Sequence, residues 1–239
     1  MRFDLSQIKM SYHDINRKIT LPAETSEELA ELIGILAGDG HVDFHPKCYD
    51  YIVQINGHLH DDLEYYQTYV QPLIKILFNI KLREVHRSSD TSIILTRKSK
   101  GIVSYLTAIG FKKKGCIITI PQWIINNPIY TTKFIRGLYD TDGGLSLKRK
   151  RNYPVLSLGL KDIKTVLYLA VWTKLREIPY YFGFRWSYWE HNGQTKKGLQ
   201  AYIQISGIKN ITKWIKIVGV SNQKKIKKCG WLDLNTPVL

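Results

Sequence analysis

The chain has 239 residues, of which 44% are hydrophobic, so it can bury a substantial core as one large domain or two small ones. Its formal net charge of +15 and its pI near 9.6 favour a polyanionic partner, and nucleic acid before a membrane surface. No run approaches the roughly 18 apolar residues of a membrane span, and the N-terminus lacks a signal-peptide pattern. Three scattered cysteines are too few for a disulfide framework or a zinc site. We therefore expect an intracellular location, in the cytoplasm of a prokaryote, and no membrane partner.

The first strong signal is a helix that ends on a carboxylate, preceded by an arm (1–24) that packs on the domain or contacts nucleic acid. Thr25 and Glu28 have the spacing of a capping box and mark the start of this helix. Apolar residues then recur at helical spacing, beside a second face of very small residues formed by Ala30, Gly34 and Gly38. Glycine inside a helix costs roughly 1 kcal/mol relative to alanine, so Gly34 indicates the close approach of another backbone.

Alternating strands and helices follow this helix. The elements predicted in order are two strands turning near Pro46 (41–45 and 49–56), a helix that Pro72 kinks (61–78), two strands (81–87 and 91–97) and a helix (101–109). A basic run at 112–114 opens a linker, which we place at 112–128.

A second helix of the same design follows about half a chain later. Thr131 or Thr132 can cap its start, Gly137 lies on its face of small residues, and Asp142 is its last side chain, as Asp39 is in the first helix. Two helices with matching small faces can pack closely and bring these two carboxylates together. Like charges at that distance are unfavourable unless a cation lies between them, so the arrangement indicates a divalent metal site.

The second half repeats the order of the first. Its predicted elements after the helix are strands (144–151 and 153–158), a helix (162–177), strands (180–190 and 200–206) and a helix (208–218). We therefore predict an α+β fold of two pseudo-symmetric αββαββα repeats, in which curved antiparallel sheets form a DNA-binding saddle and the two carboxylate-ended helices pack at the interface. The domains are the arm (1–24), the first repeat (25–111), the linker (112–128) and the second repeat with a basic C-terminal segment (129–239).

Two nine-residue segments, LIGILAGDG at 32–40 and IRGLYDTDG at 135–143, resemble the paired motifs of monomeric LAGLIDADG homing endonucleases of the archaeal intron-encoded kind. Two copies with acids at matching positions make the resemblance specific, and we call their helices the motif helices. The resemblance implies a monomer with an internal pseudo-twofold axis that takes part in intron homing. It also implies cleavage of both strands of a long double-stranded DNA target across the minor groove, leaving 3′ overhangs.

The family's metal ligand is the eighth motif residue, which corresponds to Asp39 and Asp142. The second motif also has Asp140, but it lies about 200° around the helix from Asp142, so we take only Asp142 as the ligand. By position, the carbonyls of Gly38 and Thr141 are auxiliary ligands. An acid is unfavourable at a helix C-terminus, which argues against the alternative that both acids merely end helices.

Carboxylates with open positions suit Mg²⁺, a hard cation that keeps water and phosphate oxygens among its ligands, and metal ions activate water for phosphodiester hydrolysis. The resemblance implies that Mn²⁺ can substitute and that Ca²⁺ supports binding without cleavage. Family members often place a glutamine late in the second strand, and we interpret Gln54 as positioning the water. Lys98 is the first choice for a lysine that supports the scissile phosphate, ahead of Lys113 and Lys225, with a solvated lysine or a plain phosphate contact as the alternative for each.

Polar and basic side chains that alternate with apolar ones on the strands are the predicted readers of DNA, since arginine and glutamine suit guanine and adenine edges. These are Arg83, Arg87, Lys148, Lys150, Arg185, Ser187, Trp189, Tyr202 and Gln204. The histidines show no metal-ligand spacing.

Charge is divided unequally between the halves. Residues 1–110 carry 12 Lys and Arg against 14 Asp and Glu, a net −2, whereas residues 111–239 carry 23 against 6, a net +17. We expect the second half to anchor a DNA complex, with lysines between 224 and 228 in a solvated tail that weakens the effect. Two rival functions stay open on the same scaffold: an RNA maturase that binds its intron, and a DNA-binding regulator that does not cleave.

Overall fold

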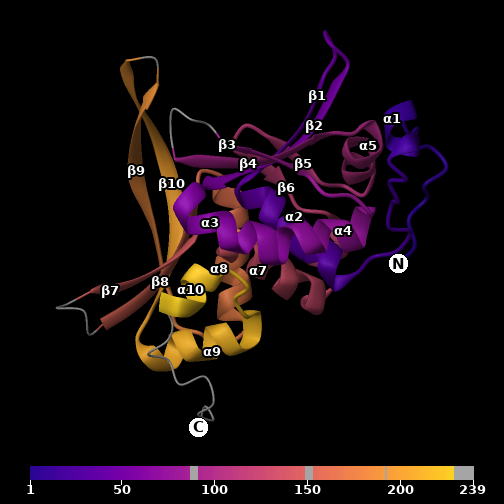
Figure 1. Ribbon diagram of the computed structural model, residues 1–239. Coiled ribbons are helices and arrows are strands. Elements are labelled where there is room, and N and C mark those ends of the chain that lie inside the picture. Colours follow the sequence, from indigo (N-terminus) through magenta and orange to yellow (C-terminus); the bar gives the residue numbers. More distant parts are fainter. Residues whose placement is uncertain (87–90, 149–152, 192, 229–239) are drawn as a thin grey trace.

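Two helices packed against each other lie at the centre of the molecule. In the computed structural model, which describes residues 1–86, 91–148, 153–191 and 193–228, α2 (Glu27–Gly38) lies alongside α7 (Pro128–Asp142). The α2 side chains from Leu29 to Ala37 are all buried. The motif helices therefore form the core between the two halves of the chain (Figure 1).

The start of α2 is set by Ser26. Its Oγ accepts a hydrogen bond from the backbone N–H of Leu29 at 3.1 Å, as an N-cap does. The predicted cap at Thr25 is wrong, because the Thr25 hydroxyl accepts from the N-terminal amine of Met1 at 3.0 Å instead.

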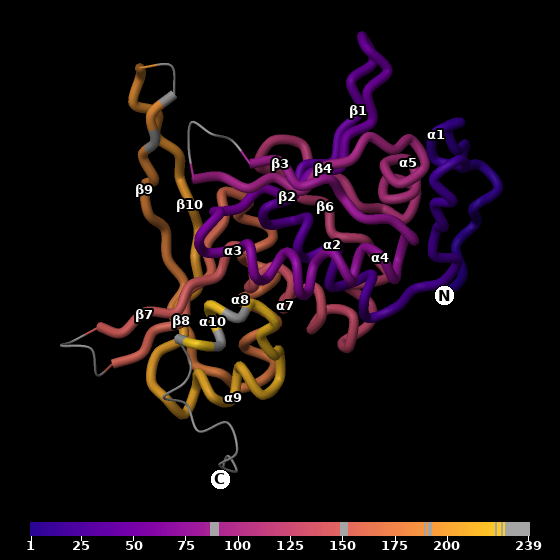
Figure 2. The backbone as a smooth tube through the Cα atoms, viewed as in Figure 1, coloured from indigo at the N-terminus to yellow at the C-terminus, as the bar shows by residue number. Residues whose placement is uncertain are grey.

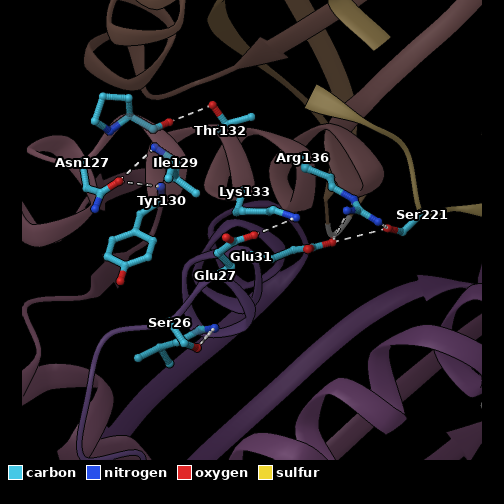
Figure 3. A network of polar contacts seen from close by, with 12 residues as sticks. Ser26, Glu27, Glu31, Asn127, Ile129, Tyr130, Thr132, Lys133, Arg136 and Ser221 are labelled. Atoms are coloured by element: carbon cyan, nitrogen blue, oxygen red, sulfur yellow. Dashed lines mark hydrogen bonds and ion pairs between the residues drawn. The ribbon is translucent and has the colours of Figure 1, made fainter. Parts of the chain in front are cut away.

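The start of α7 is set by Asn127. Its Oδ1 accepts from the N–H groups of Ile129 at 2.9 Å and Tyr130 at 3.3 Å (Figure 3). The helix begins three residues before Thr131, so neither Thr131 nor Thr132 caps it, and that prediction is also wrong. A proline directly after the cap is favourable, because the first helical residue needs no N–H donor.

Each motif helix leads directly into a four-stranded antiparallel sheet. The first sheet has the order β1 (Gly40–His45), β2 (Asp50–His58), β4 (Ser92–Lys98) and β3 (Arg83–His86). The second has the order β7 (Gly143–Lys148), β8 (Tyr153–Leu160), β10 (Gln194–Ser206) and β9 (Tyr181–His191). The matching strand order confirms the predicted two-repeat α+β fold. The halves differ in that β9 and β10 form a long hairpin that projects from the body (Figures 1 and 2).

Helices complete each repeat. The first has α3 (Leu59–Tyr65), a π-helical turn η1 (Tyr66–Val70), α4 (Gln71–Phe78) and α5 (Lys100–Ala108). The second has α8 (Ile163–Lys174), α9 (Ile208–Val218) and a short α10 (Gln223–Lys228) that the sequence did not predict. The sequence predicts a kink at Pro72, because a proline ring clashes with the carbonyl one turn earlier. The structure has the wide π-helical turn η1 directly before α4, which contains Pro72 in its first turn.

The segments outside the repeats also have structure. Between the halves lie a hairpin of β5 (Lys112–Lys114) and β6 (Ile117–Thr119) and the one-turn helix α6 (Gln122–Ile125). The N-terminal arm, with α1 (Tyr12–Asn16), packs beside α5 (Figure 2), where buried Asp14 accepts a hydrogen bond from the Gly101 N–H at 3.0 Å. Among the described residues, no helix combines the length and the apolar character needed to cross a membrane.

Each sheet has one face in the core and one open face. On β2, Val53 and Ile55 are buried, so Gln54 points to the opposite face. On β10, Ala201 and Ile203 are buried, so Tyr202 between them points to the opposite face. This alternation agrees with the sequence pattern and gives both sheets a polar open face.

Candidate active site

Two glycines let the motif helices approach to backbone contact. A Cβ atom added to Gly34 would clash with the carbonyl oxygen of Phe134, and one added to Gly137 would clash with that of Glu31. Only a hydrogen atom fits at either position without moving a backbone. The predicted close contact is therefore confirmed, and it brings the C-terminal ends of α2 and α7 together.

The two motif acids meet at these ends. Asp39 is the C-cap of α2, and Asp142 is the last residue of α7. A Cβ atom on Gly38 would lie 3.0 Å from Oδ2 of Asp142, so this carboxylate lies against the end of the other motif helix. Asp39 is partly exposed and Asp142 is exposed, so both acids are crowded by protein yet reachable from solvent.

Crowding makes both carboxylates resist ionisation. Removal from water, with a further contribution from the charge of Asp142, raises the pKa of Asp39 to about 7. The pKa of Asp142 is also raised, mainly by removal from water, against the opposing charges of Lys113 and Lys225. Asp142 keeps one side open to solvent, so its removal from water is less complete than in a core. Paired carboxylates of this kind are stabilised by a bound cation.

Two lysines, one from the linker hairpin and one from the C-terminal segment, complete the cluster. Lys113 of β5 donates a hydrogen bond to the carbonyl oxygen of Gly38. Lys225 of α10 donates to the carbonyl oxygens of Tyr139 and, at 3.3 Å, Thr141. Each ammonium group thus caps the C-terminal end of one motif helix. The carbonyl oxygens of Gly38 and Thr141, predicted as auxiliary metal ligands, therefore accept hydrogen bonds from lysines in this structure.

Burial changes the acidity of both lysines. Removal from water lowers the pKa of Lys225 to about 8 and that of Lys113 in the same direction, while the nearby acids oppose the change. Lys225 is only 8% exposed, so the expectation of a solvated tail is wrong at this residue. A signal was available in the sequence, because Lys113 and Lys225 each come a few residues after a glycine that ends a predicted helix, Gly110 and Gly219.

The structure does not bring Lys98 to the acids. Its side chain is 67% exposed, and its ammonium group lies 2.6 Å from the carboxylate of Asp50. Asn56, which contacts Asp39, pairs with Ile94, four residues from Lys98 along β4. Four strand residues span about 13 Å. The lysines placed at the acid pair are the two that the sequence ranked lower.

Asn56 lies closer to the acids than the predicted Gln54. The Asn56 backbone N–H donates to the carbonyl oxygen of Asp39 at 3.0 Å, and its side-chain amide approaches the same oxygen at 3.4 Å. Gln54 donates to Oδ1 of Asn56 at 2.5 Å. The two amides therefore form a short relay on the open face of β2 that ends at Asp39.

Two grooves reach the acids. A groove of about 800 Å³ is lined by Asp39, by β1, by Asn56 and by residues 112–115. A smaller one of about 260 Å³ is lined by Asp142, Lys113 and Gln200, among others. The acid pair is thus accessible from two grooves, one with residues of the first sheet in its lining and one with residues of the second.

The predicted DNA-contacting residues that the structure describes lie on these open faces. Strand pairing places Arg83 on the face of Gln54. It places Lys148, Arg185, Ser187, Tyr202 and Gln204 together on the open face of the second sheet. Arg185 already donates to Gln200 at 2.8 Å and lies over the Tyr202 ring at 5.4 Å. Arg87, Lys150 and the side chain of Trp189 lie outside the described residues.

Three side chains of β1 correct the expectation that no histidines have metal-ligand spacing. His41, Asp43 and His45 point the same way from β1, and their ligand atoms lie within 4.8 Å of one another. The three groups are exposed, and exposed histidines and acids commonly gather without an ion, so we give this cluster no role.

Comparison with known proteins places the fold. No family model matches the chain. It is 27% identical over 208 residues to the replication factor C small subunit of Methanocaldococcus jannaschii, a match that covers 86% of this chain and 10% of that protein. It is 32% identical over 122 residues to a DNA polymerase of Thermococcus sp., covering 51% and 7% of the two chains. The chain thus spans a tenth or less of the length of these relatives.

Solved structures resemble most of the chain. The crystal structure of I-DmoI in complex with DNA and Ca has a TM-score of 0.59 at 17% identity and covers 84% of this chain and 97% of that one. The LAGLIDADG homing endonuclease I-LtrWI bound to target DNA has a TM-score of 0.51 at 10% identity and covers 87% and 90%. At these identities the likeness shows the fold: the chain has the fold of the LAGLIDADG homing endonucleases.

Proposed function

We propose that the chain is a site-specific endonuclease that hydrolyses both strands of a long double-stranded DNA target with a divalent metal ion and leaves 3′ overhangs. The observation that carries the proposal is the meeting of two carboxylates with the buried Lys225 and the half-buried Lys113 at the shared end of α2 and α7. The stability of the two helices does not explain this cluster. Acids are unfavourable at helix C-termini, and lysines are unfavourable when they are removed from water.

The donor set fits a hard cation such as Mg²⁺. Asp39 and Asp142 offer carboxylate oxygens, the charges of Lys113 and Lys225 do not fully offset the removal of these acids from water, and the two grooves leave room for water and phosphate. A bound ion would lower the pKa of a water molecule and polarise the phosphate. Mn²⁺ would substitute, and Ca²⁺ would support binding alone.

The other residues of the cluster have roles that follow from their present contacts. Lys113 and Lys225 donate to neutral carbonyls, and a charged phosphate oxygen is a stronger acceptor. Each lysine would therefore turn to one scissile phosphate and stabilise the charge that develops there. Asn56, fixed by the carbonyl of Asp39, and Gln54 behind it would orient the attacking water.

The open faces of the two sheets would bind the DNA on either side of the cut. Arg83 in the first half and Lys148, Arg185, Tyr202 and Gln204 in the second lie on these faces. A single chain with two repeats, at 25–111 and 129–239, would then act as a monomer on a target with two unlike half-sites. Phosphate contacts would supply most of the affinity, and base contacts the specificity.

The test is selection of cleaved molecules from a random double-stranded DNA library with Mg²⁺. We expect one long sequence to be enriched, cut in both strands with 3′ overhangs, and no cleavage by the Asp39→Asn, Asp142→Asn double variant. Binding without cleavage under all metals would favour the regulator instead. Tighter binding of structured RNA than of any DNA would favour the maturase.

A further inference from the structure

The segment that carries Lys225 needs something to hold it in place. It begins at Gly219 after α9 and reaches the acid pair through Ser221 and Asn222, before the six-residue α10. No sheet contains it, and a helix of this length is not stable by itself. Even so, Ser221 is 6% exposed and Asn222 is 1% exposed, so this turn is docked against the protein and does not lie on its surface.

A buried carboxylate of α7 binds this turn. Asp140 is 1% exposed, and its Oδ2 accepts a hydrogen bond from the Ser221 N–H at 2.8 Å. The carbonyl oxygen of Asp140 accepts from the side-chain amide of Asn222 at 3.1 Å. Asp140 and Asp142 lie on opposite sides of the helix, about 200° apart. The second motif therefore presents one acid to the metal site and the other to the turn.

The other side of the turn is held by an ion pair that joins the two halves. Glu31 of α2 lies 3.3 Å from Nε of Arg136 of α7 (Figure 3). The Ser221 hydroxyl donates to Glu31 at 3.4 Å and accepts a hydrogen bond from Arg136. Tyr69 of η1 donates to the same Glu31 oxygen at 2.8 Å. The turn thus contacts both motif helices at once.

Two further ion pairs tie α10 to the first half. Lys224 pairs with Asp61, and Lys227 lies 2.9 Å from Glu64, both acids belonging to α3. These pairs are exposed, and exposed pairs contribute little. The buried contacts at Ser221 and Asn222 therefore determine where α10 lies.

We infer that Asp140, with Glu31 and Arg136, forms a docking site for the Ser221–Asn222 turn and thereby positions Lys225 at the acid pair. Only the last link, the use of Lys225 in cleavage, rests on the proposed endonuclease function. Because the docking site takes residues from both motif helices, the lysine reaches the acids only when the two halves are packed together. Asp140, which has no place in the metal site, is a positioning residue.

Hydrogen exchange tests the docking without any cleavage assay. In Asp140→Ala, backbone amides of 221–225 should exchange roughly tenfold faster or more, since a buried hydrogen bond to a charged group is lost. Asp140→Asn should show a smaller increase, because its amide oxygen can still accept from Ser221. Asn222→Ala, which leaves α7 intact, should act like Asp140→Ala. The control is Asp162→Asn, a buried acid that binds Thr165 at the start of α8 and should leave these amides unchanged.

A double-mutant cycle tests the link to the reaction. Asp140→Ala should lower kcat roughly tenfold or more at unchanged DNA affinity in Ca²⁺, and it should add nothing in the Lys225→Met background. Additive effects, or unchanged exchange in both Asp140→Ala and Asn222→Ala, would overturn the inference. If the chain cuts no DNA, the proposed function fails, and the exchange experiment alone still decides whether Asp140 holds the segment.

Discussion

Gly34 and Gly137 occupy the third position of the two motifs, and each faces the backbone of the opposite motif helix, with a Cβ atom excluded at both. Replacing either with leucine should destabilise the protein by more than the ~1–3 kcal/mol typical of overpacking, because both contacts are to backbone. In a chain of this size, each kcal/mol of lost stability lowers Tm by about 2–4 °C.

A thermal melt without DNA measures this effect. Gly144→Ala is the matched control, because a Cβ atom there meets only the Ser157 hydroxyl, at an ordinary 3.5 Å. Equal melting of the Gly34→Leu, Gly137→Leu and control variants would mean that the helices are not in close contact.

Asp39→Asn should stabilise the metal-free protein at alkaline pH. The pKa of Asp39 is about 7 in the folded state, above its usual 3.8, so the folded state holds this proton more tightly than the unfolded state. The stability from this proton is fully present below pH 4 and is lost as the pH rises through about 7. At pH 8 in EDTA the variant should therefore be more stable by about 1–2 kcal/mol, a value reduced for the solvent contact of the side chain.

Denaturant titrations of both proteins at pH 4 and pH 8 check the sign. The difference should vanish at pH 4, and saturating Mg²⁺ at pH 8 should favour the wild type, because only its site gains binding energy. If the variant is less stable than the wild type at pH 8 in EDTA, the raised pKa of Asp39 in the metal-free protein is contradicted.

Lys113→Met and Lys225→Met should each lower the cleavage rate by roughly 10²–10³, the loss seen when a donor to a developing charge is removed. DNA affinity should change little, since only one phosphate contact is lost. Lys98→Met is the control: its lysine is exposed and paired with Asp50, so cleavage should stay near wild type. If Lys98→Met slows single-turnover cleavage as much as the other two, the choice of lysines is wrong.

The sequence predicts the repeats, the helix contact and the acid pair because each depends on local spacing. Leu29 and its neighbours give the helical period, and Gly34 marks the contact. The caps are less predictable, since Thr25 and Ser26 are both good cap residues and only a tertiary contact with the N-terminal amine decides between them.

The lysines could not be assigned with the same security. The position of Lys98 at the end of a strand suits a catalytic lysine, but the sequence does not give the register of the sheet. In the structure, strand pairing puts Lys98 beside Asp50 and away from the acid pair. Lys225 lies in a segment too short and too basic to predict as a helix. Its burial depends on Asp140 and Glu31, which are distant from it in sequence.

Neutralising charges in the second half should affect salt dependence most. The net +17 of residues 111–239 against −2 for residues 1–110 gives that half most of the phosphate neutralisation. Lys148→Gln should therefore flatten the slope of log K against log salt by about 1, and Arg83→Gln by less. Both side chains are exposed on open sheet faces.

Half-site competition provides an independent reading. A duplex carrying only the half-site of the second repeat should displace full-length target better than the opposite half-site at equal salt. Equal competition would mean that the charge asymmetry has no part in anchoring DNA.

The proposed metal-binding role of the acid pair is tested most directly by cleavage and binding of Asp39→Asn and Asp142→Asn on the selected target. Neither variant should make double-strand breaks in Mg²⁺, because each removes a carboxylate that would hold the ion in the proposed site. Both should bind the target in Ca²⁺ within about threefold of wild type, since affinity comes mainly from phosphate and base contacts. Full double-strand cleavage by both single variants would contradict the assignment of Asp39 and Asp142.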